Sequence, residues 1–221
     1  MNSISKAHWE AVYETKSPNE VSWTQQVPKI SLDLIDALPL NKSAKIIDVG
    51  GGDSKLVDYL LVAGFENITV LDISHKALER AKQRLGNKAE KVNWIECDIT
   101  DFIPTTSYDL WHDRATFHFI TTKQQIEKYK NIVEKAVCGY CIIGVFSENG
   151  PLKCSGLEIK QYNETQLSSL FKDHFEKIKC LEEDHITPFN TRQNFLFCSF
   201  KRITNAGNPS TKEKPLILFN V

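Results

Sequence analysis

The sequence lacks both an excess of charge of one sign and any long apolar segment. Among its 221 residues, Lys and Arg number 27 against 28 Asp and Glu, giving a formal net charge of -1. This balance creates no field that would steer a nucleic acid or an anionic membrane, so neither is an expected partner. The polar N-terminus has no signal core, and no apolar run is long enough to cross a bilayer. We expect a cytoplasmic protein that is a monomer or a homodimer.

Cysteine is scarce in the arrangements that build metal or redox sites. The six cysteines are spread along the chain, mostly within apolar runs, so reduced thiols are the expectation. The one close pair, Cys138 and Cys141, has no second pair or histidine cluster to complete a zinc site. We therefore predict no metal and interpret this pair as packing within a strand.

The composition is that of one globular α/β domain, with 41% hydrophobic and 25% charged residues. We predict that residues 1–203 form this domain, with residues 1–40 as a helical cap, and that residues 204–221 form a C-terminal tail. The tail begins with a linker rich in Asn, Gly, Pro, Ser and Lys. Its apolar end, residues 215–221, either frays or docks as an edge strand or on a partner subunit.

Short apolar strands alternate with amphipathic helices after Asn41, which predicts a parallel sheet built by crossovers. The predicted helices cover residues 5–14, 27–37, 54–63, 74–85, 122–136 and 164–171. The predicted strands cover residues 45–49, 68–71, 92–96, 108–111, 140–146, 175–182 and 194–201. The last two strands have no helix between them and must be antiparallel, because a parallel crossover needs about a dozen residues.

Residues 46–54 (IIDVGGGDS) run from a buried strand into a helix through three consecutive glycines, Gly50, Gly51 and Gly52. Glycines allow a tight turn and a close approach of the backbone to a ligand. Lys55 stands where a dinucleotide-binding loop needs another glycine, which disfavours NAD as the cofactor. Asp48, at the strand end, places a carboxylate beside the pocket, which suits a cationic cofactor.

Two further acids end the next two strands. Asp72 lies about twenty residues beyond the glycines, where a carboxylate can accept both hydroxyls of a ribose. Asp98 can accept from an adenine amino group, while Ile99 offers a backbone N–H. Any one of these acids alone is explained as a helix cap or a solvated turn. Three strand-end acids in register indicate a nucleoside pocket.

The segments IIDVGGGDS, VLDIS, ECDITDF and YDLWHDRATFHF together resemble the successive motifs of class I S-adenosylmethionine (SAM)-dependent methyltransferases. The resemblance implies a Rossmann-like seven-stranded mixed sheet with its last strand antiparallel and helices on both faces. It also implies SAM as cofactor and S-adenosylhomocysteine as product. The residues expected to bind the cofactor are Trp9, Tyr13, Trp23, Asp48, Gly50, Gly51, Gly52, Asp72, Ile73, Asp98, Ile99 and His112.

Two narrower resemblances concern the methyl acceptor. The segments DLWHDRATFHF and GPLKCSGLEIKQY are similar to an uncharacterised bacterial branch of these enzymes. The GGGDS loop resembles that of protein lysine methyltransferases acting on elongation factors, but residues 112–115 (HDRA) replace their acidic-Lys-Gly segment. The Asn-Pro-Pro-aromatic signature of many nucleic-acid methyltransferases is absent after residue 111, which disfavours nucleic acid.

Candidates for contact with the acceptor, or for removing its proton, follow the later strands: Asp113, His118, Cys154 and His185. His118 is either a base or a hydrogen-bonded core imidazole, and Cys154 either contacts the acceptor or packs as an inert thiol. His185 is either held by its acidic neighbours or simply on the surface. Arg114 is expected to pair with one of the pocket acids.

Three aromatic residues, Trp9, Tyr13 and Trp23, precede the sheet. They either fold over the cofactor as a lid or pack one helix on the core.

The leading hypothesis is methyl transfer to a small-molecule thiol, amine or similar nucleophile. The alternatives are a protein lysine methyltransferase and a SAM-binding protein without turnover, with an NAD-dependent oxidoreductase far behind.

Replacing the acid assigned to the ribose provides a test from sequence alone. Asp72→Ala should weaken binding of S-adenosylhomocysteine by on the order of 1 to 3 kcal/mol, because a hydrogen-bonded group is lost. Calorimetric titration of the two proteins measures the difference. Unchanged affinity would contradict the assignment of Asp72.

Overall fold

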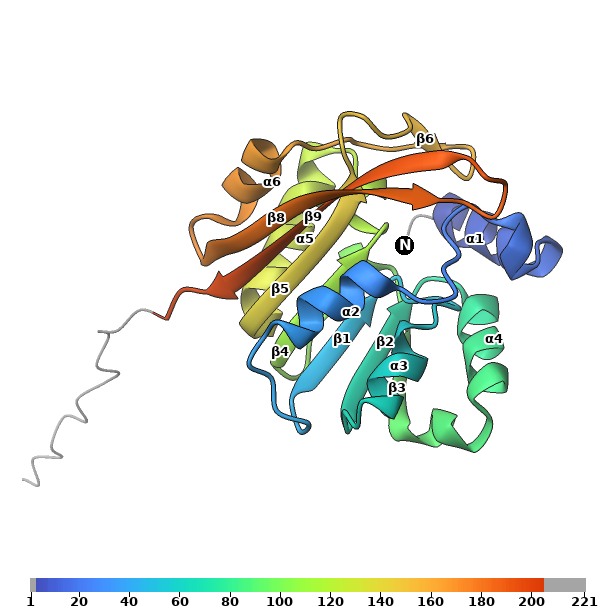
Figure 1. Ribbon diagram of the computed structural model, residues 1–221, viewed down its shortest axis with the longest axis horizontal. Coiled ribbons are helices and arrows are strands. Elements are labelled where there is room, and N and C mark those ends of the chain that lie inside the picture. Colours follow the sequence, from blue (N-terminus) through green and yellow to red (C-terminus); the bar gives the residue numbers. More distant parts are fainter. Residues whose placement is uncertain (1–2, 205–221) are drawn as a thin grey trace, which may run out of the picture.

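The computed structural model describes residues 3–204, and its framework is a seven-stranded sheet (Figure 1). Across the sheet the strands are β3 (Val92–Glu96), β2 (Asn67–Asp72), β1 (Lys45–Val49), β4 (Tyr108–Arg114), β5 (Val137–Phe146), β9 (Arg192–Arg202) and β8 (Phe175–Ile186). The last strand of the chain, β9, is antiparallel to both of its neighbours. The remaining pairings are parallel. The predicted Rossmann-like mixed sheet is confirmed.

Helices cover both faces of this sheet. They are α1 (Ser3–Thr15), α2 (Lys29–Asp36), α3 (Leu56–Val62), α4 (His75–Leu85), α5 (Lys123–Ala136) and α6 (Glu164–Phe171). Shorter elements are the 3₁₀ helices η1 (Pro18–Glu20), η2 (Gly86–Lys91), η3 (Ile99–Asp101) and η4 (Phe117–Phe119), and a small hairpin of β6 (Lys153–Cys154) and β7 (Leu157–Glu158).

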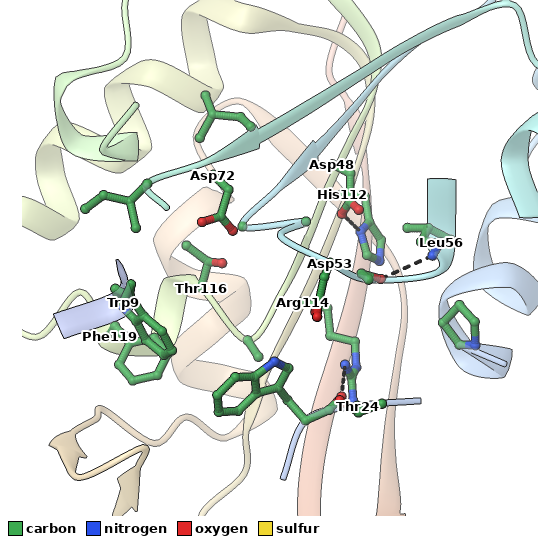
Figure 2. A pocket seen from close by; sticks show the side chains of 18 of the residues that line it. Trp9, Thr24, Asp48, Asp53, Leu56, Asp72, His112, Arg114, Thr116 and Phe119 are labelled. Atoms are coloured by element: carbon green, nitrogen blue, oxygen red, sulfur yellow. Dashed lines mark hydrogen bonds and ion pairs between the residues drawn. The ribbon is translucent and has the colours of Figure 1, made fainter. Parts of the chain in front are cut away.

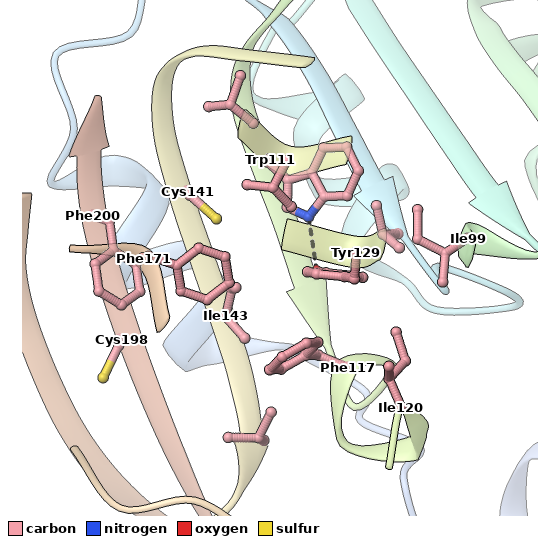
Figure 3. Packing of buried hydrophobic residues seen from close by; sticks show 14 of the residues in the cluster. Ile99, Trp111, Phe117, Ile120, Tyr129, Cys141, Ile143, Phe171, Cys198 and Phe200 are labelled. Atoms are coloured by element: carbon pink, nitrogen blue, oxygen red, sulfur yellow. Dashed lines mark hydrogen bonds between the residues drawn. The ribbon is translucent and has the colours of Figure 1, made fainter. Parts of the chain in front are cut away.

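Two apolar clusters fill the space between the sheet and its helices. Successive side chains of a strand point to opposite faces, so Ile46 packs with α2, α3 and α4, whereas Ile47 packs with α5 and α6. In the second cluster the indole N–H of Trp111 donates to the hydroxyl of Tyr129 at 3.0 Å, which satisfies both buried polar atoms (Figure 3).

The element boundaries differ from the predicted ones mainly where strands carry polar residues. Strand β4 runs to Arg114 rather than to residue 111, because His112 and Asp113 continue the pairing with β1 and β5. Strand β8 likewise extends to Ile186, through charged residues at the edge of the sheet. The polar side chains at these positions predicted loops, although the strand pairing continues through them.

The cysteine prediction was wrong for one pair. Cys180 on β8 and Cys198 on β9 form a disulfide bond, with Cα atoms 4.2 Å apart. They lie directly opposite one another in the antiparallel register. That register depends on the turn between the two strands, so the sequence spacing did not reveal the pairing. The other cysteines, Cys97, Cys138, Cys141 and Cys154, are free thiols.

The fold also fixes where a ligand can bind. Strand β1 lies between β2 and β4, and the chain crosses to one side after β1 and returns on the other side with β4. In open α/β sheets, such a reversal leaves a crevice at the carboxyl ends of the strands. Within residues 3–204, no helix has both the length and the apolar character needed to span a membrane. The predicted linker and docking segment of the tail, from residue 205 onward, lie outside the described residues.

Reduction of the Cys180–Cys198 disulfide should lower the free energy of unfolding by about 2 to 4 kcal/mol, because the unfolded chain regains loop entropy. Urea unfolding with and without reductant measures this loss. Cys138→Ser keeps the disulfide and should respond to reductant as the wild type does. Alkylation of the denatured, unreduced protein should modify four thiols, and modification of all six would show that the bond does not form.

Candidate active site

The glycine loop that follows β1 is packed too tightly for larger side chains. Gly50 and Gly52 adopt the left-handed conformation, with φ of 65° and 46°. A Cβ atom on Gly51 would lie 2.7 Å from Oδ2 of Asp48. A Cβ atom on Gly52 would lie 2.8 Å from the hydroxyl of Tyr13, which places α1 directly over the loop. Packing within the protein therefore requires these glycines, whichever ligand binds.

Acidic side chains gather beside this loop. Oδ1 of Asp72 accepts a hydrogen bond from the backbone N–H of Ser74 at 2.8 Å. The pKa of Asp72 is raised from 3.8 to about 7, first by burial and in part by the negative charges of Asp53 and Asp48, against the opposing effect of the Ser74 hydrogen bond. Asp98 caps η3, since its Oδ1 accepts from the backbone N–H of Thr100 at 2.8 Å.

A hydrogen-bonded chain joins the carboxyl ends of β1 and β4. Nδ1 of His112 lies 2.7 Å from Oδ1 of Asp48, and Nε2 of His112 lies 2.9 Å from Oγ of Ser31 on α2. All three side chains are buried. With the proton on Nδ1, the imidazole donates to the carboxylate and accepts from the serine hydroxyl. In this tautomer both ring nitrogens of His112 have a hydrogen-bond partner.

Helix α1 is held across the site by polar contacts. The carboxylate of Glu10 accepts hydrogen bonds from the backbone N–H groups of His75 and Lys76, at 2.8 and 3.1 Å. These groups are free donors at the N-terminus of α4, where a negative charge is stabilising. Arg80, also on α4, donates a hydrogen bond at 2.7 Å to the carbonyl of Lys16, the residue that directly follows α1. The polar contacts attach α1 by its charged side, while Trp9 and Tyr13 face the interior.

These elements enclose one cavity of about 480 Å³ (Figure 2). Most of the residues predicted to bind the cofactor line it: Trp9, Tyr13, Trp23, Asp48, Gly50, Gly51, Asp72, Ile73, Asp98, Ile99 and His112. Gly52 is outside this lining set and lies beneath Tyr13 instead. The three aromatic residues contact one another, with the Trp9 and Trp23 ring centroids 5.7 Å apart.

Three of the four predicted catalytic residues, Asp113, His118 and His185, do not line the cavity. Asp113 is fully buried, accepting from the Tyr129 hydroxyl at 2.6 Å and from the backbone N–H groups of Thr116 and Phe117. His118 is also fully buried, and its ring packs on Phe119, which does line the cavity. Burial lowers the pKa of His118 to about 3, so its imidazole is neutral and a poor base. The contacts of both side chains organise the turn after β4.

Cys154 and His185 differ in their relation to the cavity, because only Cys154 of these two lines it. Cys154 lines it, but burial raises the pKa of its thiol to about 11, which keeps the sulfur protonated. Nε2 of His185 lies 2.7 Å from the carbonyl of Ser22, and Nδ1 lies 3.4 Å from Nε2 of Gln25. Both ring nitrogens therefore hold the segment that precedes α2.

Several residues that line the cavity were not predicted as site residues, among them Thr24, Arg114, Thr116 and Phe119. Thr116 and Phe119 follow Ala115, whose φ of 68° turns the chain sharply after β4. This left-handed residue brings Thr116 against Gly50. The motif containing these residues was visible in the sequence, but the direction of each side chain depends on that turn.

The chain resembles known proteins in part of its sequence and in its fold. Residues 46–135 match a family model described as a methyltransferase domain. Over this region, which is less than half of the chain, the sequence is similar to methyltransferase domains. The matched region begins in β1 and ends in α5, and so includes the glycine loop and the strand-end acids.

The individual relatives are distant, and the chain spans about a sixth of the length of the first of them. The chain is 22% identical to eEF1A lysine and N-terminal methyltransferase of Mus musculus over 124 residues, which are 55% of this chain but only 17% of that protein. A structure from work on the conversion of a disulfide bond into a thioacetal group during echinomycin biosynthesis has a TM-score of 0.72 at 16% identity, covering 91% of this chain and 94% of the other.

A second solved structure is Burkholderia thailandensis 1,6-didemethyltoxoflavin-N1-methyltransferase, with bound 1,6-didemethyltoxoflavin and S-adenosylhomocysteine. Its TM-score is 0.67 at 16% identity, covering 91% of this chain and 88% of the other. Both structural likenesses show the fold.

The raised pKa of Asp72 predicts a pH-dependent stability. The folded chain holds this proton more tightly than the unfolded chain does. The protonated carboxyl therefore stabilises the fold fully below about pH 4, and this contribution is lost as the pH rises from about 4 to about 7. Between pH 5 and pH 8, wild type should lose on the order of 1 to 3 kcal/mol more stability than Asp72→Asn, which does not titrate. Urea unfolding at the two pH values measures this difference.

The matched control is Asp173→Asn, at an exposed position. It should follow the wild type at both pH values. Parallel loss of stability in wild type and Asp72→Asn would contradict the raised pKa.

Proposed function

We propose that the methyltransferase domain moves a methyl group from SAM to a small-molecule nucleophile such as a thiol or an amine. The observation that carries the proposal is one cavity of about 480 Å³ that is bordered both by the strand-end acids and by an aromatic cover. Cavities of this size are typical of small-molecule sites. The aromatic cover consists of Trp9, Tyr13, Trp23 and Phe119.

The residues present fit a cationic nucleoside cofactor. Asp48, Asp53 and Asp72 all border the same part of the cavity, and the raised pKa of Asp72 reflects their mutual repulsion in addition to burial. A positively charged ligand relieves that repulsion. Asp72 would hold the ribose, and Asp98 with Ile99 would hold the adenine, as the order of their strands suggests.

When bound, the cofactor would supply a methyl group activated by its sulfonium sulfur, which leaves as the thioether of S-adenosylhomocysteine. The chain's own contribution is then alignment of the acceptor and exclusion of water. Trp9 and Phe119, whose ring centroids are 5.1 Å apart, close the cavity on one side. Cys154, which lines the cavity, bears on the acceptor through position rather than by removing its proton, because the thiol stays protonated. His185 supports the wall from outside, since both of its ring nitrogens contact the segment that precedes α2.

A protein lysine methyltransferase is the second candidate. The similarity to the mouse eEF1A methyltransferase and the GGGDS loop favour it. The enclosed aromatic cavity and the HDRA segment at residues 112–115 favour a small molecule instead. The two candidates differ in the size of the labelled product.

Incubation of the full chain with methyl-labelled SAM tests the proposal, using the low-molecular-mass and the protein fractions of a cell lysate as separate acceptor sources. We expect label in the low-molecular-mass fraction. Asp72→Ala serves as the control for label that does not depend on the proposed site. Label confined to a protein band would overturn the proposal, and so would tight binding of S-adenosylhomocysteine without transfer to either fraction.

A further inference from the structure

Arg114, the last residue of β4, carries a hydrogen-bond donor that is not used within the protein. Its Nη1 donates to the carbonyl of Trp23 at 3.0 Å. Its Nη2 is buried without a hydrogen-bond partner, although the side chain lines the cavity. Among residues 3–204, no carboxylate lies within 4.0 Å of this guanidinium, so the expected pairing of Arg114 with a pocket acid was wrong. Geometry directs the arginine to a backbone carbonyl instead.

This unpaired cation is costly to the folded chain. Burial lowers the pKa of Arg114 to about 10, which still leaves the guanidinium charged at neutral pH. Its charge lies over the face of Phe195, with 5.1 Å between Cζ and the ring centroid. A buried charge with an unused donor is stabilised most by an anion that accepts from it.

A second unused donor belongs to Thr24, the residue after the Trp23 carbonyl that Arg114 holds. Its Oγ1 is buried without a partner, and Thr24 lines the same cavity. Figure 2 shows Arg114 and Thr24 beside one another on the wall of the cavity. A guanidinium next to a hydroxyl supplies two donors, and the two oxygens of a carboxylate can accept from both.

The surrounding charges favour a singly charged anion. Asp48 on β1 and Glu183 on β8 both act electrostatically on Arg114. Their negative charges offset part of the arginine's field without reaching hydrogen-bond distance. These two acids repel a dianionic phosphate about twice as strongly as a singly charged carboxylate, whose one charge the arginine balances.

We propose that Arg114 and Thr24 form a carboxylate-binding subsite for the methyl acceptor, which is therefore a carboxylic acid. The inference rests on the proposed function, because it assigns the acceptor of that reaction to a chemical class. The subsite holds the acid group, and the nucleophilic atom of the same molecule is then directed into the remainder of the cavity.

The position of Arg114 in the sheet assigns this carboxylate to the acceptor rather than to the cofactor's amino-acid end. The acids assigned to the nucleoside, Asp72 and Asp98, follow β2 and β3. The contacts of Arg114 come instead from the other half of the sheet, since Phe195 belongs to β9. Cys154, which follows β5, also acts electrostatically on Arg114. The groups around Arg114 thus come mainly from the half of the sheet away from Asp72 and Asp98.

Benzoate is a suitable probe because the cavity is lined by aromatic rings, and benzamide is its neutral counterpart. NMR titration of the labelled full chain, with and without S-adenosylhomocysteine, measures both affinities. We expect saturable binding of benzoate, weaker binding of benzamide, and a loss of about tenfold or more in benzoate affinity for Arg114→Gln. Equal affinities for benzoate and benzamide, or an unchanged benzoate affinity in Arg114→Gln, would overturn the subsite.

Two further variants keep the test independent of folding. Thr24→Val preserves shape and removes the hydroxyl, so benzoate affinity should fall severalfold even if Arg114→Gln does not fold. Arg114→Lys keeps the charge but loses the planar donor pair, and its affinity should lie between those of wild type and Arg114→Gln. Unchanged benzoate affinity in Thr24→Val would count against the proposed donor pair.

A last comparison separates the acceptor from the cofactor. Affinities for S-adenosylhomocysteine and for 5′-methylthioadenosine, which lacks the carboxylate, are measured for wild type and Arg114→Gln. We expect neither affinity to change. A loss for S-adenosylhomocysteine alone would place the cofactor's carboxylate on Arg114 and overturn the assignment to the acceptor. Failure of the proposed function would instead appear as absent methyl transfer in wild type, whatever the result with benzoate.

Discussion

The parallel pairing of β1 with both β2 and β4 is the constraint on which the site depends. It sets Asp48 beside Val70 on one side and beside His112 on the other, so one carboxylate faces both halves of the cavity. The pleat then decides which polar residues can take part. His112 shares a face with Leu110 and reaches Asp48, whereas Asp113 points to the opposite face and meets Tyr129. One residue of register separates a cavity residue from a core residue.

The cavity that results is electrically polarised. Carboxylates from β1 and β2 line it where the pKa of Asp72 is raised, and the charged guanidinium of Arg114 lines it at the end of β4. Within the described residues, neither Asp72 nor Arg114 forms an ion pair with a side chain of opposite charge. The site therefore favours a ligand pair whose charges are opposite in sign to those of the walls.

The sequence predicted the framework well and the side-chain directions poorly. Residues 45–49 and 164–171 were predicted with the bounds they have, because polar residues and turns frame apolar runs of the right period. The strand-end acids were predictable because strand order and spacing alone bring them together. Asp113 was misplaced with respect to the cavity because its strand continues to Arg114. The disulfide and the unpaired donors depend on register and turn geometry, which residue types do not encode locally.

Glu10 anchors α1 through charge rather than through apolar contact, since its carboxylate accepts hydrogen bonds from free N–H groups at the start of α4. Lys6 and Glu96 add an ion pair at the same edge. Dissolved ions screen such contacts, while they leave aromatic packing comparatively intact. Raised ionic strength should therefore loosen the attachment of α1 more than it loosens the aromatic packing on its inner side.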